Sequence, residues 1–425
     1  MMAVMLILFL VLILIGVPIA WGTGLATVLF IEANNTIPIS LLAQRIFKTS
    51  DSFSLLAIPL FMLAGEFMNG GGITKRIVEL ASKWVGHITG SLGHVTVLAS
   101  MLFASMSGSS AASAASIGGM LIPTMKEKGY DGGYAVAVTS CASVMGPIIP
   151  PSIAFVVYAS LTGDSISSLF LGGIIPGILM GLALMILCYT IAKKNHYPVE
   201  KKASWKERFI ALRHSILALM MPIIILGGIM SGVFTATEAG GIGVVYGLIV
   251  GLVTKELKIK KIPEILINAA KTTTAIMMIM GTSQVLAWIL TSAQLPQKMT
   301  MMFMGISNNA TVTFLLLMLL ILFLGCFMVD AAIMPIMAPL MMPIIRNFGI
   351  NPIHFGVVIN MVAVAGGVTP PVGNLLYIAC GIAKESVMKA AKALIPFLIA
   401  ILAAMVLCAL IPGLVTFIPS LVGGV

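Results

Sequence analysis

The chain has 425 residues, of which 59% are hydrophobic and 9% are charged, and its mean hydropathy is +1.12. This composition excludes a soluble globular fold and predicts a polytopic helical membrane protein within a lipid bilayer. The net charge of +10 does not indicate a nucleic-acid partner, because the basic residues lie in short stretches between apolar runs. Their distribution instead reports membrane topology.

The first part of the chain contains two membrane helices, an amphipathic stretch and a hairpin. The apolar runs at about 2–31 and 53–69 are predicted membrane helices, and the basic stretch 74–83 is a predicted amphipathic helix on the cytoplasmic face. Residues 92–107 and 110–125 are each short for a spanning helix of about 20 residues. Because the small-residue segment SGSSAAS separates them, we predict a re-entrant hairpin that enters from the cytoplasm.

A broken helix and a basic linker follow the hairpin. The segment 132–161 is split by GPIIPPS, and a helix at 169–192 returns to the linker 193–214, which holds seven Lys or Arg against two Glu. The positive-inside rule places this linker, and by counting outward the N-terminus, in the cytoplasm. Two further crossings, 215–232 and 238–254, come next. In the second crossing, Thr-Ala-Thr-Glu has the pattern of a helix capping box.

The second half of the chain has the same order of elements. We predict a long helix at 265–291, a short amphipathic piece at 296–303, a hairpin at 311–346, a split helix at 353–383 and a final helix at 388–411. The additional crossing that precedes this half reverses its orientation, so the second hairpin enters from the outside. Each face of the membrane then receives one hairpin.

The two halves repeat each other at an offset of 220 residues, and both place a double proline inside an apolar segment. Paired interrupted helices in equivalent places of two halves indicate a secondary transporter and its binding site. The predicted fold class is therefore an all-α polytopic membrane protein with an inverted-topology repeat, two re-entrant helical hairpins and two broken helices. The matched positions include Gly146 with Gly366, Pro150 with Pro370, Pro151 with Pro371 and Ser110 with Asp330.

The repeat also predicts how the chain divides. Scaffold helices and an amphipathic arm open each repeat, and a hairpin with a broken helix forms its transport part. The predicted boundaries are 1–90 for the first scaffold and arm, 91–192 for the first transport part, 193–214 for the linker, 215–308 for the second scaffold and arm, 309–412 for the second transport part and 413–425 for a C-terminal tail.

Hairpin tips and helix breaks are the predicted binding elements, because non-helical backbone at membrane depth is tolerated only inside protein or beside a wet cavity. Carbonyls there can coordinate a cation, and N–H groups at a helix start attract an anion. Oxygen ligands without dedicated acids suit Na⁺. We expect Pro151 and Pro371 in the first turn of each second half-helix. The predicted ligands of Na⁺, in two or more sites, are Ser107, Gly108, Ser110, Gly146, Pro150, Met328, Asp330, Gly366 and Thr369, and the predicted substrate-binding residues are Ser109, Ser113, Ser152, Asp330 and Asn374.

Motifs in these segments resemble one transporter family. GVFTATEAGGIGVVYGL resembles the G-x-F-T-P-T-E-A motif of the large membrane subunit of TRAP (tripartite ATP-independent periplasmic) transporters. SGSSAAS, GPIIPPSI, HFGVV and TPPVGNL resemble its other signatures, in order, over roughly residues 5–420. The chain departs from the pattern at Ala236, where Pro is usual, and at Gly240 and Gly241, where Ala is common.

The resemblance implies a Na⁺-driven importer of the ion-transporter-superfamily type that moves its substrate by an elevator-type displacement. It also implies a bacterial inner-membrane location and two partners, a small four-helix membrane subunit and a soluble periplasmic substrate-binding protein. Carried over residue by residue, the family's cation and substrate region falls on Ser107 to Ser110, Gly146 to Ser152, Asp330 and Gly366 to Asn374.

Other functions remain open on the residues alone. A stand-alone ion-coupled anion symporter or antiporter would use similar hairpins without a binding protein. An enzyme is not expected: an aspartyl intramembrane protease needs two membrane Asp, and only Asp330 qualifies. The absence of a Walker A motif from this chain excludes a primary pump within it. Proton coupling normally uses several membrane acids or His, which argues for Na⁺.

The substrate is predicted as an organic acid. No Lys or Arg lies within either break, so half-helix amides and hydroxyls would hold the anion. This suits a monocarboxylate sugar acid such as sialic acid as well as a C4-dicarboxylate. We favour the sugar acid, because the breaks offer no pair of separated cationic clamps.

Overall fold

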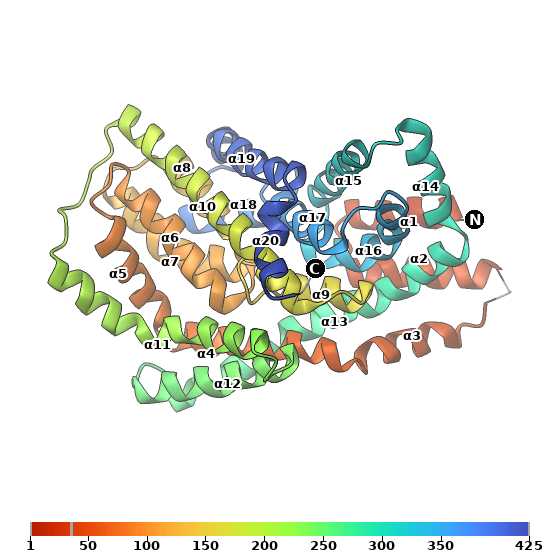
Figure 1. Cartoon of the computed structure of the whole chain (residues 1–425), viewed down its shortest axis with the longest axis horizontal. Coiled ribbons are helices and arrows are strands. Elements are labelled where there is room, and N and C mark those ends of the chain that lie inside the picture. Colours follow the sequence, from red (N-terminus) through yellow and green to blue (C-terminus); the bar gives the residue numbers. More distant parts are fainter. Residues whose placement is uncertain (1, 35–36, 424–425) are drawn as a thin grey trace.

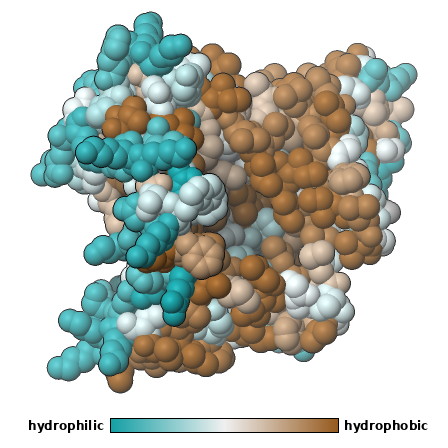
Figure 2. All heavy atoms as spheres, turned by 60° about the vertical axis from the view of Figure 1, so that its left-hand side comes forward, coloured by the Kyte–Doolittle hydropathy of each residue, from teal (hydrophilic) through white to brown (hydrophobic). Residues whose placement is uncertain are grey.

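The computed structural model describes residues 2–34 and 37–423, and these residues form helices and no strand. Within this described part of the chain, six helical segments are long and apolar enough to cross a membrane. In Figure 2, hydrophilic side chains gather along one side of the molecule, whereas much of the remaining visible face is hydrophobic. A hydrophobic surface of this extent is expected where a protein contacts lipid.

The first repeat opens with scaffold helices and continues into a hairpin and a broken helix. The scaffold and arm are α1 (Met2–Leu14), α2 (Ile19–Asn34), α3 (Ser40–Ser50), the 3₁₀ turn η1 (Phe53–Leu56), α4 (Ala57–Gly70) and α5 (Ile73–Val85). The hairpin is α6 (Ser91–Ser107) with α7 (Ser110–Glu127), the broken helix is α8 (Gly132–Ser143) with α9 (Ile153–Thr162), and the return helix is α10 (Ile166–Asn195).

Two helices connect the repeats, and the second repeat then has the same order of elements. The connecting helices are α11 (Trp205–Met230) and α12 (Ala236–Val253). The second repeat consists of η2 (Ile259–Lys261), α13 (Ile262–Ser292), α14 (Leu295–Ile306), the hairpin α15 (Ala310–Gly325) with α16 (Asp330–Asn347), the broken helix α17 (Pro352–Gly366) with α18 (Asn374–Ala383), α19 (Val387–Leu410) and α20 (Gly413–Leu421).

The predicted repeat of two hairpins and two broken helices is confirmed. The second arms of the hairpins begin at Ser110 and Asp330, which are separated by the expected 220 residues. The broken helices begin after Asp131 and Asn351, at the same offset, and each of these side chains caps its helix by accepting a backbone N–H hydrogen bond. The register of the repeat therefore extends from sequence into helix caps.

The second repeat runs in the opposite direction to the first. In the second half of α9, the Tyr158 hydroxyl donates to the Pro352 carbonyl at the start of α17 over 3.1 Å. Where α18 ends, the Ala383 carbonyl accepts from Lys126, which precedes the start of α8, over 2.7 Å. Each broken helix thus ends beside the start of the other. In Figure 1 the hairpin α6–α7 lies on the left and the hairpin α15–α16 on the right.

The predicted single helix at 2–31 is wrong, because the structure has two helices there. They are separated by a bend at Gly16, which has a φ of +88°, and Pro18. A positive φ favours glycine, and proline cannot donate to the helix ladder, so these two residues end α1 before α2 begins. Hydropathy could not reveal the bend, since both sides of it are apolar.

The connecting helix α11 begins at Trp205, ahead of the predicted start at Ser215, and shortens the predicted linker. Ser204 and Glu207 form a capping box that starts the helix: the Ser204 hydroxyl accepts from the Glu207 N–H over 3.2 Å, and the Glu207 carboxylate accepts from the Ser204 N–H over 2.7 Å. The predicted capping box of the next crossing is confirmed at Thr235 and Glu238.

The structure also differs from the sequence predictions at the two double prolines, in the C-terminal tail and at helix α3. Pro151 precedes the cap Ser152, and Pro371 precedes the cap Gly373 by two residues, so neither lies in the first turn of the following half-helix. The predicted tail 413–425 contains α20, and its last two residues lie outside the described part of the chain. The helix α3 was not predicted, because its eleven residues are too few and too polar for a membrane span.

The linker contacts both the arm and the base of the first hairpin. The Glu200 carboxylate accepts a hydrogen bond from the Ser82 hydroxyl of α5 over 2.9 Å and forms an ion pair with Lys128 at the end of α7. Partial burial raises the pKa of Glu200, but the hydrogen bonds from Lys128 and Ser82 outweigh it and hold the pKa below its ordinary value. We call this side of the molecule the linker face.

We expect Glu200→Gln to lower the free energy of unfolding at pH 7 by about 0.5–1 kcal/mol, the upper range for an exposed ion pair. A carboxylate whose pKa is lowered by folding stabilises the protein above its unfolded pKa and loses this contribution as the pH falls through the folded value. The difference between wild type and variant should therefore shrink below about pH 4.3. Thermal unfolding of both proteins in detergent at a series of pH values measures this difference in stability. Lys201→Gln is the control, and a difference independent of pH contradicts the expectation.

Candidate functional site

The tip of the first hairpin packs directly on the first helix break. A Cβ atom at Gly146 would lie 2.7 Å from the Ser109 carbonyl oxygen, and one at Gly108 would lie 2.8 Å from the Pro151 carbonyl oxygen. Gly108 also has a φ of +59°, which favours glycine. Backbone thus meets backbone at both positions, and only residues without a side chain permit this approach.

The second tip and break make an equivalent contact. A Cβ atom at Gly366 would lie 2.3 Å from the Cα atom of Gly325, and the Val372 N–H donates to the Cys326 carbonyl over 3.2 Å. Because Gly366 occupies the position of Gly146 in the repeat, the same residue type performs the same steric task in both copies. Each hairpin tip is therefore joined to the break of its own repeat.

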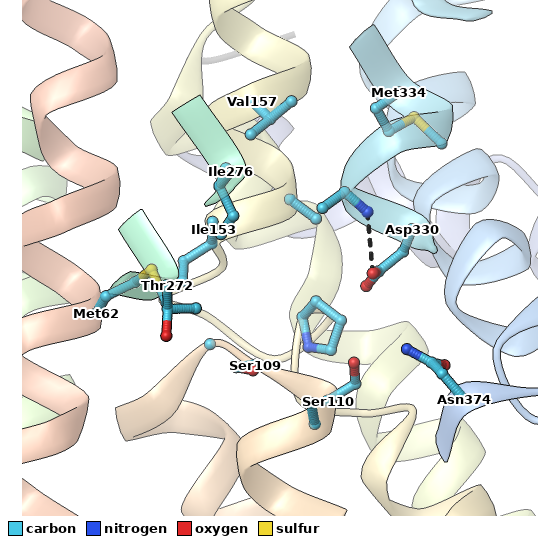
Figure 3. A pocket seen from close by; sticks show the side chains of 15 residues that line it. Met62, Ser109, Ser110, Ile153, Val157, Thr272, Ile276, Asp330, Met334 and Asn374 are labelled. Atoms are coloured by element: carbon cyan, nitrogen blue, oxygen red, sulfur yellow. Dashed lines mark hydrogen bonds between the residues drawn. The ribbon is translucent and has the colours of Figure 1, made fainter. Parts of the chain in front are cut away.

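A cavity of about 180 Å³ lies between the two repeats, and we call it the inner cavity. Figure 3 shows Ser110, Asp330 and Asn374 directed toward the same space, with Met62, Thr272 and Ile276 on its other side. The remaining lining residues are Gly108, Ser109, Ala111, Pro147, Ile153, Ala154, Val157, Ala331 and Met334.

Four helices begin at the inner cavity. Ser110 of α7, Ile153 of α9, Asp330 of α16 and Asn374 of α18 are the first residues of their helices, and all four line it. A helix N-terminus carries unsatisfied N–H groups and a positive partial charge of roughly half a unit. No Lys or Arg is among the lining residues. The cavity is thus suited to an anion that is held mainly by helix ends.

The helix starts of the two repeats are capped differently. Ser109 accepts a hydrogen bond from the Ala112 N–H over 3.3 Å and caps α7, whereas Val329 and Gly373 give α16 and α18 no side-chain cap. Instead, the Asp330 carboxylate accepts from the Ala331 N–H over 2.9 Å (Figure 3). The second repeat therefore brings uncapped amides and one carboxylate to the cavity.

The predicted cation ligands of the first repeat lie at the cavity or at the contact behind it. Gly108 and Ser110 line the cavity. Ser107 accepts from the Ser109 N–H over 3.4 Å and does not line it. The carbonyls of Gly146 and Pro150 accept no hydrogen bond from the described residues, so both oxygens remain available to a cation.

The predicted cation ligands of the second repeat divide in the same way. Asp330 lines the inner cavity, whereas Met328 lines a neighbouring cavity of about 310 Å³. Thr369 donates its hydroxyl to the Ala365 carbonyl over 2.9 Å, and Gly366 lies at the contact with the second tip. The bend between α1 and α2, which sequence analysis missed, lines that neighbouring cavity and covers the second tip.

The predicted substrate-binding residues are only partly brought together. Ser109, Asp330 and Asn374 line the inner cavity, whereas Ser113 and Ser152 do not. The buried Ser113 hydroxyl has no hydrogen-bond partner within the described residues. The Ser152 hydroxyl donates to the Pro147 carbonyl and accepts from the Phe155 N–H over 3.2 Å. Ser152 thus caps α9 by the second of these hydrogen bonds, and the first one ties it to the backbone of the break.

Among the lining residues that were not predicted from the sequence, three belong to scaffold helices. Met62 belongs to α4, and Thr272 and Ile276 belong to α13, so scaffold helices complete the wall of the inner cavity. Apolar and hydroxyl residues are ordinary in membrane helices, and these three lie far from the hairpins and breaks. No sequence signal distinguished them from packing residues.

Residues 6–414 match the family model described as "Tripartite ATP-independent periplasmic transporter, DctM component". The chain is 38% identical to the sialic acid TRAP transporter large permease protein SiaM of Vibrio cholerae, covering 96% of this chain and 95% of that one. It is 38% identical to the 2,3-diketo-L-gulonate TRAP transporter large permease protein YiaN of Escherichia coli, with 94% and 95% covered. It is 36% identical to the C4-dicarboxylate TRAP transporter large permease protein DctM of Pseudomonas aeruginosa, with 90% of each chain covered.

The fold is similar to one solved transporter structure. The crystal structure of the Alcanivorax borkumensis YdaH transporter, described as having an unusual topology, aligns with a TM-score of 0.59 over 85% of this chain and 86% of that one. At 13% sequence identity, this likeness concerns the fold alone. The family match and the relatives confirm the resemblance that the motifs indicated. The chain belongs to the DctM family of tripartite ATP-independent periplasmic transporters and is a membrane transport protein.

Proposed function

We propose that the chain is the permease of a Na⁺-coupled importer for an organic acid that a periplasmic binding protein delivers. The observation that carries this proposal is the convergence of four helix N-termini on one cavity without Lys or Arg. Such a cavity attracts a carboxylate through helix dipoles and free amides. It does not hold the carboxylate with a fixed cation, which would oppose release on the other side of the membrane.

Sodium is the proposed coupling ion. The unpaired carbonyls of Gly146 and Pro150 offer hard oxygen ligands behind the first tip, and so does the hydroxyl of Ser107, two residues before the Ser109 backbone that packs on Gly146. At the second break the Thr369 hydroxyl and the Gly366 carbonyl are further oxygens, although the carbonyl already accepts from the Thr369 N–H over 2.9 Å. Asp330 adds the one carboxylate of the inner cavity, and a bound cation would offset its repulsion of an anionic substrate.

The proposed substrate is a monocarboxylate sugar acid, with a C4-dicarboxylate as the competing class. Relatives of similar identity are named for sialic acid, 2,3-diketo-L-gulonate and C4-dicarboxylates, so identity alone does not choose between the classes. The absence of Lys and Arg among the lining residues of the inner cavity favours a substrate with one carboxylate. Hydroxyl groups of a sugar acid could bond to Ser109, Ser110 and Asn374.

We further propose the partners, location and movement of the protein. A small membrane subunit and the binding protein would complete the three components that the family description implies. By the positive-inside rule, the basic linker supports a cytoplasmic linker face and N-terminus, and the family match supports a bacterial inner membrane as the location. Because α4 and α13 contribute one wall of the inner cavity and the hairpins with the broken helices contribute the other, an elevator-type displacement of the hairpins and broken helices along this wall would carry the substrate.

Substrate class can be tested by uptake into proteoliposomes that contain the chain and both partners. We expect Na⁺-dependent accumulation of sialic acid, and we expect other sugar acids to compete with it. Succinate should compete with an affinity at least about tenfold weaker, since the loss of one contact of 1.4 kcal/mol gives this ratio. Uptake of succinate with no uptake of sialic acid rejects the sugar-acid assignment. Transport by the chain without the binding protein would instead favour a stand-alone symporter.

Asp330→Asn tests the carboxylate of the inner cavity. The amide keeps the shape of the side chain and can still accept from the Ala331 N–H, but it removes the charge that would hold Na⁺. We expect Na⁺-dependent uptake to fall about 10- to 100-fold, the range for losing a hydrogen bond or ligand to a charged group, with an unchanged elution profile in size-exclusion chromatography. Glu127→Gln, at an exposed carboxylate in the corresponding hairpin arm of the other repeat, is the control. Wild-type uptake by Asp330→Asn rejects the proposed role.

Gly146→Ala tests the contact between tip and break. The added methyl would meet the Ser109 backbone at 2.7 Å, so we expect a loss of about 1–3 kcal/mol in stability and reduced uptake by the folded fraction. Gly119→Ala in α7, where a Cβ meets no atom within 4 Å, is the control and should transport normally. Equal thermal stability and uptake in the two variants would show that tip and break do not need this close approach.

A further inference from the structure

A second polar cavity lies between α3, α9 and α13, and we call it the outer cavity. Its volume is about 460 Å³, within the range of sites for small organic molecules. Arg45 and Lys48 of α3 line it together with Asp51, and Ser160 of α9 and Gln284 of α13 add polar groups. This cavity contains the cations that the inner cavity lacks.

The two cavities follow one another along the same pair of helices. Val157 of α9 and Ile276 of α13 line the inner cavity, and Leu161 and Met280 line the outer cavity. Each outer residue lies four positions beyond its inner counterpart, on the same helix face and about 6 Å further along the axis. The two cavities are therefore neighbours along α9 and α13, and these four apolar side chains line them where they come closest along both helices.

The outer cavity lies away from the linker face. The segment that precedes α13 lies at the linker face, because its Glu256 forms an ion pair with Arg76 of α5 over 2.8 Å. From there α13 runs past the inner cavity at Thr272 to the outer cavity at Gln284. With the linker in the cytoplasm, the outer cavity would face the periplasm.

The charges of the outer cavity favour an anion. Arg45 and Lys48 are three residues apart on one face of α3, and no ion pair with Asp51 or another acid is formed by either within the described residues. The Arg45 guanidinium lies 5.3 Å from the centre of the Trp288 ring, a cation–π contact that holds it without neutralising it. Two cations thus stand against one carboxylate.

We propose that the outer cavity is a vestibule in which Arg45 and Lys48 capture the carboxylate of the incoming organic anion before it reaches the inner cavity. This inference rests on the proposed function and extends it. Full positive charges at the mouth raise the rate of capture, and a guanidinium fits a carboxylate through two parallel hydrogen bonds. The inner cavity then needs only helix dipoles, so the anion is captured strongly outside and released easily inside.

Uptake kinetics provide the first test. In proteoliposomes with both partner components and labelled sialic acid, the double variant Arg45→Gln, Lys48→Gln should raise the apparent KM about tenfold, the lower range of electrostatic steering, and change the maximal rate less than twofold. Lys298→Gln, at an exposed cation of α14 that lines neither cavity, should leave both values unchanged. A wild-type KM in the double variant overturns the vestibule. Failure of the wild type to take up any organic acid would count against the proposed function instead.

Thiol labelling tests the same charges without transport or a binding protein. Ser160→Cys, in a background with the five native cysteines replaced, is treated from outside with the anionic sulfonatoethyl and the cationic trimethylammonioethyl methanethiosulfonates. The measured quantity is the ratio of the labelling rate with the anionic reagent to the rate with the cationic reagent. We expect this ratio to be about tenfold higher with Arg45 and Lys48 present than after Arg45→Gln, Lys48→Gln is added. An equal ratio in both backgrounds, or labelling only from the linker face, overturns the proposal even where transport kinetics are altered.

Discussion

Burial of interrupted backbone is the constraint on which the rest of the structure depends. A helix that stops within a bilayer exposes amides and carbonyls that lipid cannot satisfy, and here each break is covered by the tip of a hairpin that itself stops at the same depth. Gly146 and Gly366 permit this close packing of tip on break, because neither residue has a side chain to separate the two backbones. Since tips and breaks meet pairwise, the helices that restart from them all begin in one small region and direct their positive ends into the inner cavity.

The two copies share this geometry but differ in chemistry. In the first copy, the helices that restart at the tip and the break are capped by the hydroxyls of Ser109 and Ser152. In the second copy, the equivalent helices α16 and α18 have no side-chain cap, and Val372 at the break is 48% exposed. Asp330 takes the place of Ser110 in the repeat. A carboxylate at a helix start is stabilised by the dipole it faces. The repeat thus brings two equivalent helix starts to the inner cavity, one neutral and the other acidic, which in the proposed function would let an anion and a cation share it.

Sequence predicted the hairpins and breaks well, because each depends on local signals that the repeat doubles: short apolar runs, small residues between them and a double proline. Prediction from the sequence failed for features that depend on tertiary packing. The bend at Gly16 and Pro18 lies within uninterrupted apolar sequence, and its role in covering the second tip depends on packing with α15 and α18 residues far along the chain. Likewise, Met62 and Thr272 become cavity residues only because scaffold helices close one wall. Ser152 was predicted correctly as part of a break, yet its hydroxyl is used by the helix start rather than left for substrate.

The faces of α9 and α13 that line both the inner and the outer cavity indicate how the proposed movement would affect the two cavities. α9 belongs to a broken helix and α13 to the scaffold, so in the proposed elevator they would slide past each other. A shift of one helical turn, about 5.4 Å, would bring Leu161 of α9 to the level that Val157 now occupies against α13. The outer cavity would then lose one wall as the inner cavity gained another. Because the cations of α3 pack on the scaffold side, through Arg45 and Trp288, they would stay behind while the helix N-termini travelled with the anion, so the displacement itself would separate the substrate from the charges that captured it.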